Sequence, residues 1–332
     1  MDEKDFRKYL IEQNVDQNLV KRYMNRIHEY NSYLENERKT LEDINPDELI
    51  NYTEYLVSFD KELVLDFLRA IIHFANFTKN YDLITSVIDI SESYNAMDTL
   101  FSRIAEIHGE EIRDAIFKEM PVPPVGVDPE KKPEYTKAIL RRAEEILGED
   151  NIIELLSPCL HGRPPDDIPG DKKKLKELGI DKFLKEKHEE LVIRLQKHRE
   201  EGTLEFAQYI DNEIIETIRN DNMYGFGIRE GNTIYTKKIP YQFRKSLDTQ
   251  EDNLKRFYIC YCPWVRGAMK ENTVDESLQH FCHCSAGWYK LYWDQIFEHS
   301  IKAEPVTTAL DGSLECKIAV HIPEEILKPF IK

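Results

Sequence analysis

The spacing of apolar side chains is the feature that most restricts what this chain can fold into. Up to about residue 220, apolar side chains recur every three or four residues, a period that places them on one face of a helix. Asn45 and Pro46 also predict a helix start, because asparagine caps a helix and proline suits its first turn. Two apolar stripes mark the first ninety residues: Val20, Tyr23, Met24, Ile27 and Leu34, then Leu63, Phe67, Ala70, Ile71 and Phe74. This part is expected to be a helical bundle.

After Asp221 the pattern changes to that of short strands. Residues 226–240 predict a hairpin that turns at Gly231 and Asn232, and residues 306–323 predict a second one with Asp311 and Gly312 at its tip. The segment RFYICYCPW has the composition of a strand, and HFCHCSAGWYKLYWDQIF is expected to be a strand that runs into a helix. The expected fold class is therefore α+β and predominantly helical, with a small antiparallel sheet that carries helices at the C-terminal end.

The chain is longer than one hydrophobic core usually supports, and two segments rich in proline interrupt the helical pattern. One is PVPPVGVDPEKKP at residues 121–133, and the other is SPCLHGRPPDDIPGD at residues 157–171. We expect three parts: a helical bundle at 1–90, a helical region with proline-rich breaks at 91–220, and a cysteine-rich α+β domain at 221–332.

Charge and composition restrict the partners. The chain has 62 acidic and 45 basic side chains, a net charge of -17, so most of its surface would repel a phosphate backbone, and DNA binding is disfavoured. The first ten residues lack the apolar core of a signal peptide, and no stretch is apolar for long enough to span a membrane. These features predict a cytoplasmic protein without a membrane partner. No sequence feature specifies an oligomeric state.

The cysteines are the strongest candidates for chemistry, because five of the six lie between Cys260 and Cys316. On strands, Cys260 and Cys262 would share one face, as would Cys282 and Cys284, with His283 opposite. Thiols that converge in this way favour zinc, which holds them deprotonated. Two alternatives stay open: the cysteines are buried as small apolar side chains, or one of them is a reactive thiol.

Aromatic and cationic residues near these cysteines are candidates for a ligand pocket. They are Trp264, Arg266, Trp288 and Lys290, which would offer apolar walls and charged hydrogen bonds to a small planar or carboxylate-bearing molecule. At helical spacing the same aromatic residues also suit a core. Cys159 and His161 lie in the second proline-rich break, where a loop either folds over the C-terminal site or only connects helices.

The N-terminal bundle resembles the SAM-like core-binding domain of phage-type integrases. The resemblance rests on FRKYLIEQNVDQNLVKRYMNRIHEYNSYL, LEDINPDELINYTEYL and AIIHFANFTKN, and it covers only the first quarter of the chain. It implies a helical bundle that contacts DNA. Residues 1–90 carry 18 acidic side chains against 11 basic ones, so a role in oligomerisation or packing is the alternative.

The last hundred residues resemble the 2-amino-thiazoline-4-carboxylate hydrolase-like proteins and, more distantly, the small-molecule-binding 4-vinyl-reductase-type domain. The residues that carry this resemblance are YCPWVRGAM, FCHCSAGWYKLYWDQIF and PVTTALDGSLECKIAVHIP. The second domain has a zinc site near its ligand pocket. The resemblance implies Glu304 and Cys316 as late ligands and Cys282 or Cys284 as the early one, with Thr307 where that domain has a further cysteine.

Three functions are expected from these features. The first is a sensor-like protein that binds a small molecule beside a zinc or thiol site. The second is a hydrolase of a C–N or C–S bond in a small heterocycle, in which the thiolate of Cys282 or Cys284, or a metal-bound water, attacks. His161, His283 or His321 would then act as the general base. The third is a DNA-associated regulator that uses the N-terminal bundle.

Overall fold

The computed structural model describes residues 3–41 and 44–332, except for the side chains of residues 61 and 62. The chain divides into two compact units: Met1–Tyr94 with Val122–Lys132, and Asn95–Pro121 with Pro133–Lys332. The segments expected at 91–220 and 221–332 thus share the second unit, apart from residues 91–94 and Val122–Lys132 of the first proline-rich break, which belong to the first unit. The structure is mostly helical with two small antiparallel sheets, which confirms a predominantly helical α+β class.

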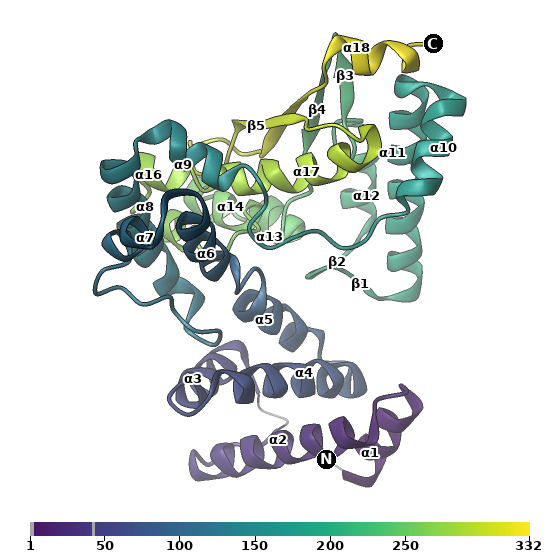
Figure 1. The fold of residues 1–332 in the computed structure, drawn as a ribbon. Coiled ribbons are helices and arrows are strands. Elements are labelled where there is room, and N and C mark those ends of the chain that lie inside the picture. The colour runs from purple at the N-terminus through teal and green to yellow at the C-terminus, as the bar shows by residue number, and fades with distance from the viewer. Residues whose placement is uncertain (1–2, 42–43) are drawn as a thin grey trace. The chain divides into compact units, whose positions relative to one another are not determined.

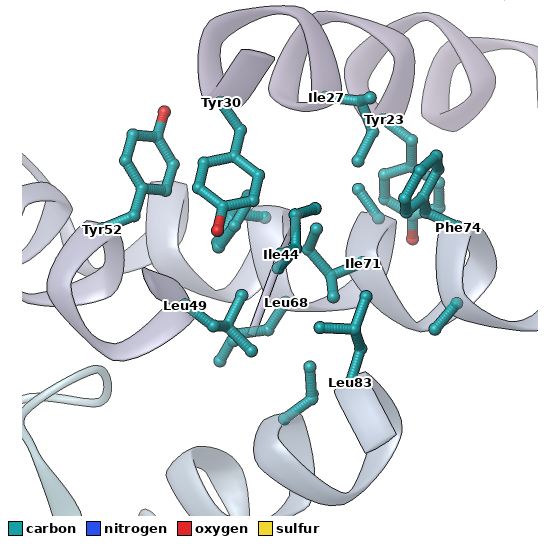
Figure 2. Close-up of a cluster of buried hydrophobic side chains, with 14 of the residues drawn as sticks. Tyr23, Ile27, Tyr30, Ile44, Leu49, Tyr52, Leu68, Ile71, Phe74 and Leu83 are labelled. Atoms are coloured by element: carbon teal, nitrogen blue, oxygen red, sulfur yellow. The ribbon is translucent and has the colours of Figure 1, made fainter. Parts of the chain in front are cut away.

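Unit 1 is a bundle of helices around an aromatic core. Its helices are α1 (Glu3–Glu12), α2 (Gln17–Asn36), α3 (Pro46–Val57), α4 (Lys61–Thr78) and α5 (Tyr81–Ser91). The expected helix start is confirmed, since the Asn45 side chain accepts a hydrogen bond from the Glu48 backbone N–H and Pro46 opens α3. Figure 2 shows the core, in which Tyr30 and Tyr52 have ring centroids 4.6 Å apart. Residues 42 and 43 of the integrase-like segment lie outside the described residues.

Unit 2 places helices around a four-stranded antiparallel sheet (Figure 1). The strands are β3 (Ile228–Glu230), β4 (Thr233–Lys237), β5 (Lys302–Thr307) and β6 (Lys317–His321), in the order β3-β4-β6-β5. Ile234 and Ala303 both pair with Val320, which fixes the register of the three longer strands. The hairpin expected at 226–240 is confirmed. Strands β5 and β6 also pair with each other as successive antiparallel strands, but β5 begins earlier than expected and residues 308–316 form the loop between them. A separate two-stranded ribbon joins β1 (Leu204–Glu205) to β2 (Gln208–Tyr209).

The helices of unit 2 lie before, between and after these strands. They are α6 (Ala96–His108), α7 (Glu110–Ile116), α8 (Lys132–Leu147), α9 (Glu149–Leu156), α10 (Ile168–Leu178), α11 (Ile180–Glu201), α12 (Asn212–Arg219), α13 (Phe243–Asp248), α14 (Asp252–Ile259), α15 (Gly267–Lys270), α16 (Glu276–Gln279), α17 (Cys282–Phe297) and α18 (Glu324–Leu327). No helix among the described residues has the length and apolarity needed to cross a lipid bilayer.

Two strand predictions are wrong. The segment RFYICYCPW contains the end of α14 and an irregular stretch, and HFCHCSAGWYKLYWDQIF forms α17 from Cys282 onward. The reason is the burial pattern of α17, where Ala286, Tyr289, Trp293 and Ile296 recur every three or four residues and pack in one core with the sheet. Strand-like composition was overridden by this tertiary contact. Cys260, Cys262, Cys282 and Cys284 therefore do not lie on strand faces.

Candidate metal centre

All six cysteines belong to unit 2 and form two neighbouring groups at the start of α17. In the first group, which we call the metal triad, the ligand atoms of Cys159, His161 and Cys284 all lie within 4.8 Å of one another. The second group is formed by the thiols that line one small cavity, which we call the thiol cavity: Cys260, Cys262, Cys282 and Cys316. Helix α17 supplies one cysteine to each group.

The metal triad depends on a close approach between α17 and the loop that follows α9. An added Cβ at Gly287 would lie 2.1 Å from the Ser157 carbonyl oxygen and 2.6 Å from the Cys159 nitrogen, so only glycine fits there. Gly287 follows Cys284 by three residues and hence lies on the same side of the helix. The missing side chain lets the loop lie directly on the helix, with Cys159 next to Cys284.

Arg103, on α6, holds the same loop from the other direction. Its guanidinium donates to three backbone carbonyls, at 2.5 Å to Leu155, 2.6 Å to Pro158 and 3.3 Å to Cys159. A guanidinium presents five donors in a rigid plane, which suits this bridging of several carbonyls. These three hydrogen bonds hold the loop backbone from Leu155 to Cys159, where the loop reaches the triad.

Hydrogen bonds shift the pKa values of the two triad cysteines in opposite directions. The Cys284 thiol donates to the Cys159 sulfur and lowers the pKa of Cys159; burial opposes this, and a hydrogen bond from His161 lowers the pKa further. The same contact with Cys159 raises the pKa of Cys284 well above its usual range. The Leu160 backbone N–H also donates to the Cys284 sulfur at 3.2 Å. Cys159 is thus favoured as a thiolate, the form of cysteine that binds metals and acts as a nucleophile.

The triad offers two sulfur ligands and one imidazole. Cys159 and Cys284 are buried, with 7% and 2% of their surface exposed, while His161 is half-buried. Two sulfurs and one imidazole form a set that binds borderline metal ions such as zinc, and three protein ligands leave a position for water or another ligand. The Cys159, His161 and Cys284 group lies close enough together to bind a metal.

The thiol cavity is small, with a volume of about 30 Å³. Cys260 follows α14, Cys282 begins α17 and Cys316 precedes β6, so the thiols come from distant parts of the chain. Burial raises the pKa of Cys260 and of Cys282, and it raises that of Cys316 to about 11. Proximity of the thiols to one another adds to the shift for Cys282 and Cys316.

Lys238 also lines this cavity, and the sequence reasoning missed it. Its ammonium nitrogen donates to the Ser285 hydroxyl at 3.0 Å and lies 4.7 Å from the centre of the Tyr261 ring. Burial lowers the pKa of Lys238, but Tyr289 and three of the cavity sulfurs outweigh burial, so the pKa is raised overall. The sequence shows only that Lys237 and Lys238 are adjacent in the predicted hairpin. Adjacent lysines do not indicate which of the two side chains lines a cavity.

The residues expected to bind a ligand do not line the thiol cavity. Trp264 is 1% exposed and belongs to the core, and the Arg266 guanidinium lies 4.6 Å from the Tyr241 ring. Trp288 is covered by the Arg163 guanidinium at 3.6 Å, and Lys290 pairs with Asp294 at 2.6 Å. Each of these side chains therefore packs against or pairs with other residues of the fold and does not line this cavity.

Glu304 and His283 lie apart from both cysteine groups. Glu304 pairs with His321 at 2.8 Å and with Lys302 at 2.7 Å, and it alternates along β5 with Pro305 and Thr307, which face the cavity. The Nδ1 atom of His283 is buried without a hydrogen-bond partner among the described residues, and burial lowers the pKa of this imidazole. Of the residues expected to bind metal, four line the cavity and Cys284 belongs to the triad.

Comparisons of the chain with protein-family models, with curated proteins and with solved structures find no match. The resemblances to the integrase core-binding domain and to the hydrolase-like and 4-vinyl-reductase-type proteins therefore stay predictions.

Proposed function

We propose that this protein binds zinc through the metal triad and that the open position on the metal takes a small ligand. The observation that carries the proposal is the convergence of the ligand atoms of Cys159, His161 and Cys284 within 4.8 Å. Two cysteines and a histidine with one open position are typical of zinc sites that bind exogenous molecules, whereas closed structural sites use four protein ligands.

The size of the thiol cavity argues against an enclosed organic ligand in that cavity. Pockets for small organic molecules usually measure about 300 to 1,000 Å³, and this cavity, at about 30 Å³, has room for one water molecule or one ion. The expected sensor-like function then takes a specific form: a thiol or carboxylate group of the small molecule coordinates the zinc at the half-buried His161 side of the triad.

A hydrolase is the second candidate, and the open position on the triad also favours it. Bound zinc would supply Lewis acidity and an activated water at that position. The chain would supply the buried side chains around that position, whereas His283, expected as the base, does not belong to the triad. A free thiol attack by Cys282 has less support, because burial raises the pKa of Cys282 and so keeps it protonated.

The zinc content of the purified full-length chain tests the proposal. Elemental analysis should find zinc bound, and Cys159→Ser, His161→Gln and Cys284→Ser should each lose one equivalent per chain. His299→Gln is the control, because His299 is exposed at the end of the same helix. Retention of the full zinc content in all three triad variants would overturn the proposal.

The ligand is tested next with the zinc-loaded chain. Small thiols and aromatic carboxylates should raise its melting temperature, and His161→Gln should abolish that shift. Turnover of a thiazoline or similar heterocycle that disappears in the same variant would favour the hydrolase over the sensor. No shift and no turnover would leave zinc binding as a structural role only.

A further inference from the structure

Two adjacent lysines at the end of β4 lie in different electrostatic surroundings. The Lys237 ammonium pairs with the carboxylates of Asp221 at 3.0 Å and Glu315 at 2.6 Å. Lys238 lines the thiol cavity, and no carboxylate among the described residues pairs with it or lines the same wall. Asp311, which directly follows a residue of that wall, accepts hydrogen bonds from two backbone N–H groups of its own loop. Within the described part of the chain, Lys238 is therefore a cation without a carboxylate partner.

The groups that contact Lys238 are neutral. Its ammonium donates to the Ser285 hydroxyl at 3.0 Å and lies 4.7 Å from the centre of the Tyr261 ring. The cysteines of the wall do not neutralise it, because burial raises the pKa of Cys282, and that of Cys316 to about 11, so both thiols keep their protons at neutral pH. A cation in an enclosed wall loses hydration, and an anionic partner offsets that loss. The cavity is thus electropositive.

Two hydroxyl groups in the same wall have no hydrogen-bond acceptor among the described residues. The Thr307 Oγ1 atom is buried without a partner of any kind in this part of the chain. The Ser285 hydroxyl accepts from Lys238, but its own O–H finds no acceptor in the same described residues. Hydroxyls in an enclosed wall are ordinarily hydrogen-bonded, because an unpaired polar group costs free energy. A ligand that only accepts hydrogen bonds would satisfy the ammonium and both hydroxyls.

We infer that the thiol cavity binds one small monovalent anion of the halide class, with the Lys238 ammonium as its counter-charge and the hydroxyls of Ser285 and Thr307 as hydrogen-bond donors. The volume of about 30 Å³ admits one such ion, and an anion accepts from all three groups. The first turn of α17 supplies Cys282 and Ser285 to the wall, so the positive end of this helix also favours an anion there. A cation is disfavoured, because the charged group of the wall is positive.

Chloride binding to the purified full-length chain, followed by NMR, tests this assignment. The chloride signal broadens when the ion exchanges with a protein site, so the line width at constant ionic strength measures the affinity. The chain should broaden the signal, and bromide should reverse the broadening by competition. Gluconate should not compete, because this organic anion is too large for a cavity of about 30 Å³.

Two variants remove one anion-binding group each. Lys238→Met should weaken chloride binding by about 10-fold or more, because the counter-charge is lost. Thr307→Val keeps the charge and the shape of the side chain, and the loss of its hydroxyl should weaken binding by about 3- to 10-fold. Lys328→Met is the control, because it removes the same charge at an exposed position near the C-terminus. Circular dichroism shows whether each variant has folded, and Thr307→Val decides the test if Lys238→Met does not fold.

Repeating the measurement after chelation separates this site from the proposed zinc site, which uses none of the cavity residues. Broadening that survives chelation and falls in both variants supports the anion site. Broadening that disappears on chelation and is unchanged in Lys238→Met would place the chloride on zinc, which overturns the anion site and leaves the proposed function intact. Absence of broadening with the wild-type chain, or equal competition by gluconate, would also overturn it. Zinc retained in all triad variants would defeat the proposed function alone.

Discussion

Gly287 of α17 lies directly against Ser157 of the loop that carries Cys159, because glycine has no side chain at the point where this loop crosses the helix. An added Cβ at Gly287 would lie 2.1 Å from the Ser157 carbonyl oxygen, a distance that no side chain tolerates. This contact brings Cys159 to Cys284 although the two cysteines are far apart in the sequence. The candidate centre therefore depends on a packing contact as much as on its ligands.

The first prediction concerns this contact. Gly287→Ala should destabilise the chain by about 1 to 3 kcal/mol and reduce metal binding at the triad, because the loop must move away from the helix. In an unobstructed helix the same change stabilises by about 1 kcal/mol. Urea unfolding and zinc content measure the two effects, with Gln295→Ala at an exposed position of α17 as the control. A more stable variant with full zinc content would contradict the packing argument.

Arg103 gives the second prediction, because it holds the loop through three carbonyls. Arg103→Lys keeps the charge but loses the planar set of donors, so we expect a loss of about 1 to 3 kcal/mol in unfolding free energy. Zinc affinity at the triad should fall in parallel, as measured by competition with a chelator. Arg219→Lys, at an exposed helix position, should change neither quantity. Equal behaviour of the two variants would rule out the role given to Arg103.

The third prediction is the effect of metal removal. A ligand that binds only the folded chain stabilises it by about 2.7 kcal/mol at a concentration one hundred times its dissociation constant. Saturating zinc should therefore raise the melting temperature, and a chelator should lower it again. Cys284→Ser should lose the part of this response that comes from the triad. If chelation leaves the melting temperature unchanged, the metal does not join the loop to α17.

The fourth prediction is a pH effect in unit 1. Burial lowers the pKa of His73, whose ring lies 5.5 Å from that of Tyr23. A histidine with a lowered pKa in the folded state favours the neutral form there, so its stabilising effect is complete above the unfolded value of about 6.5 and is lost as pH falls below it. His73→Gln should reduce the loss of stability between pH 7.5 and pH 5.5, as measured by urea unfolding.

His299→Gln serves as the control for this measurement, because His299 is exposed in unit 2. If His73→Gln and the control lose stability equally as the pH falls, His73 does not contribute to the pH dependence.

The fifth prediction tests a helix cap beside the small ribbon of unit 2. The Asp211 carboxylate caps α12 by accepting from the Ile214 N–H at 3.0 Å, and it pairs with Arg244 at 2.6 Å. Asp211→Ala should cost about 1 kcal/mol, whereas Asp211→Asn keeps the cap and should cost less. Urea unfolding of both variants decides this. Equal costs would mean that the charge, and not the cap, stabilises this end of the helix.

Local sequence patterns determined the helices of unit 1 and the hairpin at 226–240. Asn45 and Pro46 mark a helix start, and Gly231 marks a hairpin turn, because these residues act on the backbone within a few positions of themselves. The gathering of cysteines at the C-terminal end was also evident from the sequence, since five of the six lie close together along it.

Tertiary structure alone decided which thiols meet. The segment from Cys282 to Phe297 has strand-like residues, yet it is a helix because its apolar side chains pack with the sheet at helical spacing. That change of element directs Cys282 to the cavity and Cys284 to Cys159 and His161. Whether a loop crosses a helix at Gly287, or Lys238 lines the same cavity as the cysteines, depends on contacts between distant segments, and short-range patterns do not encode such contacts.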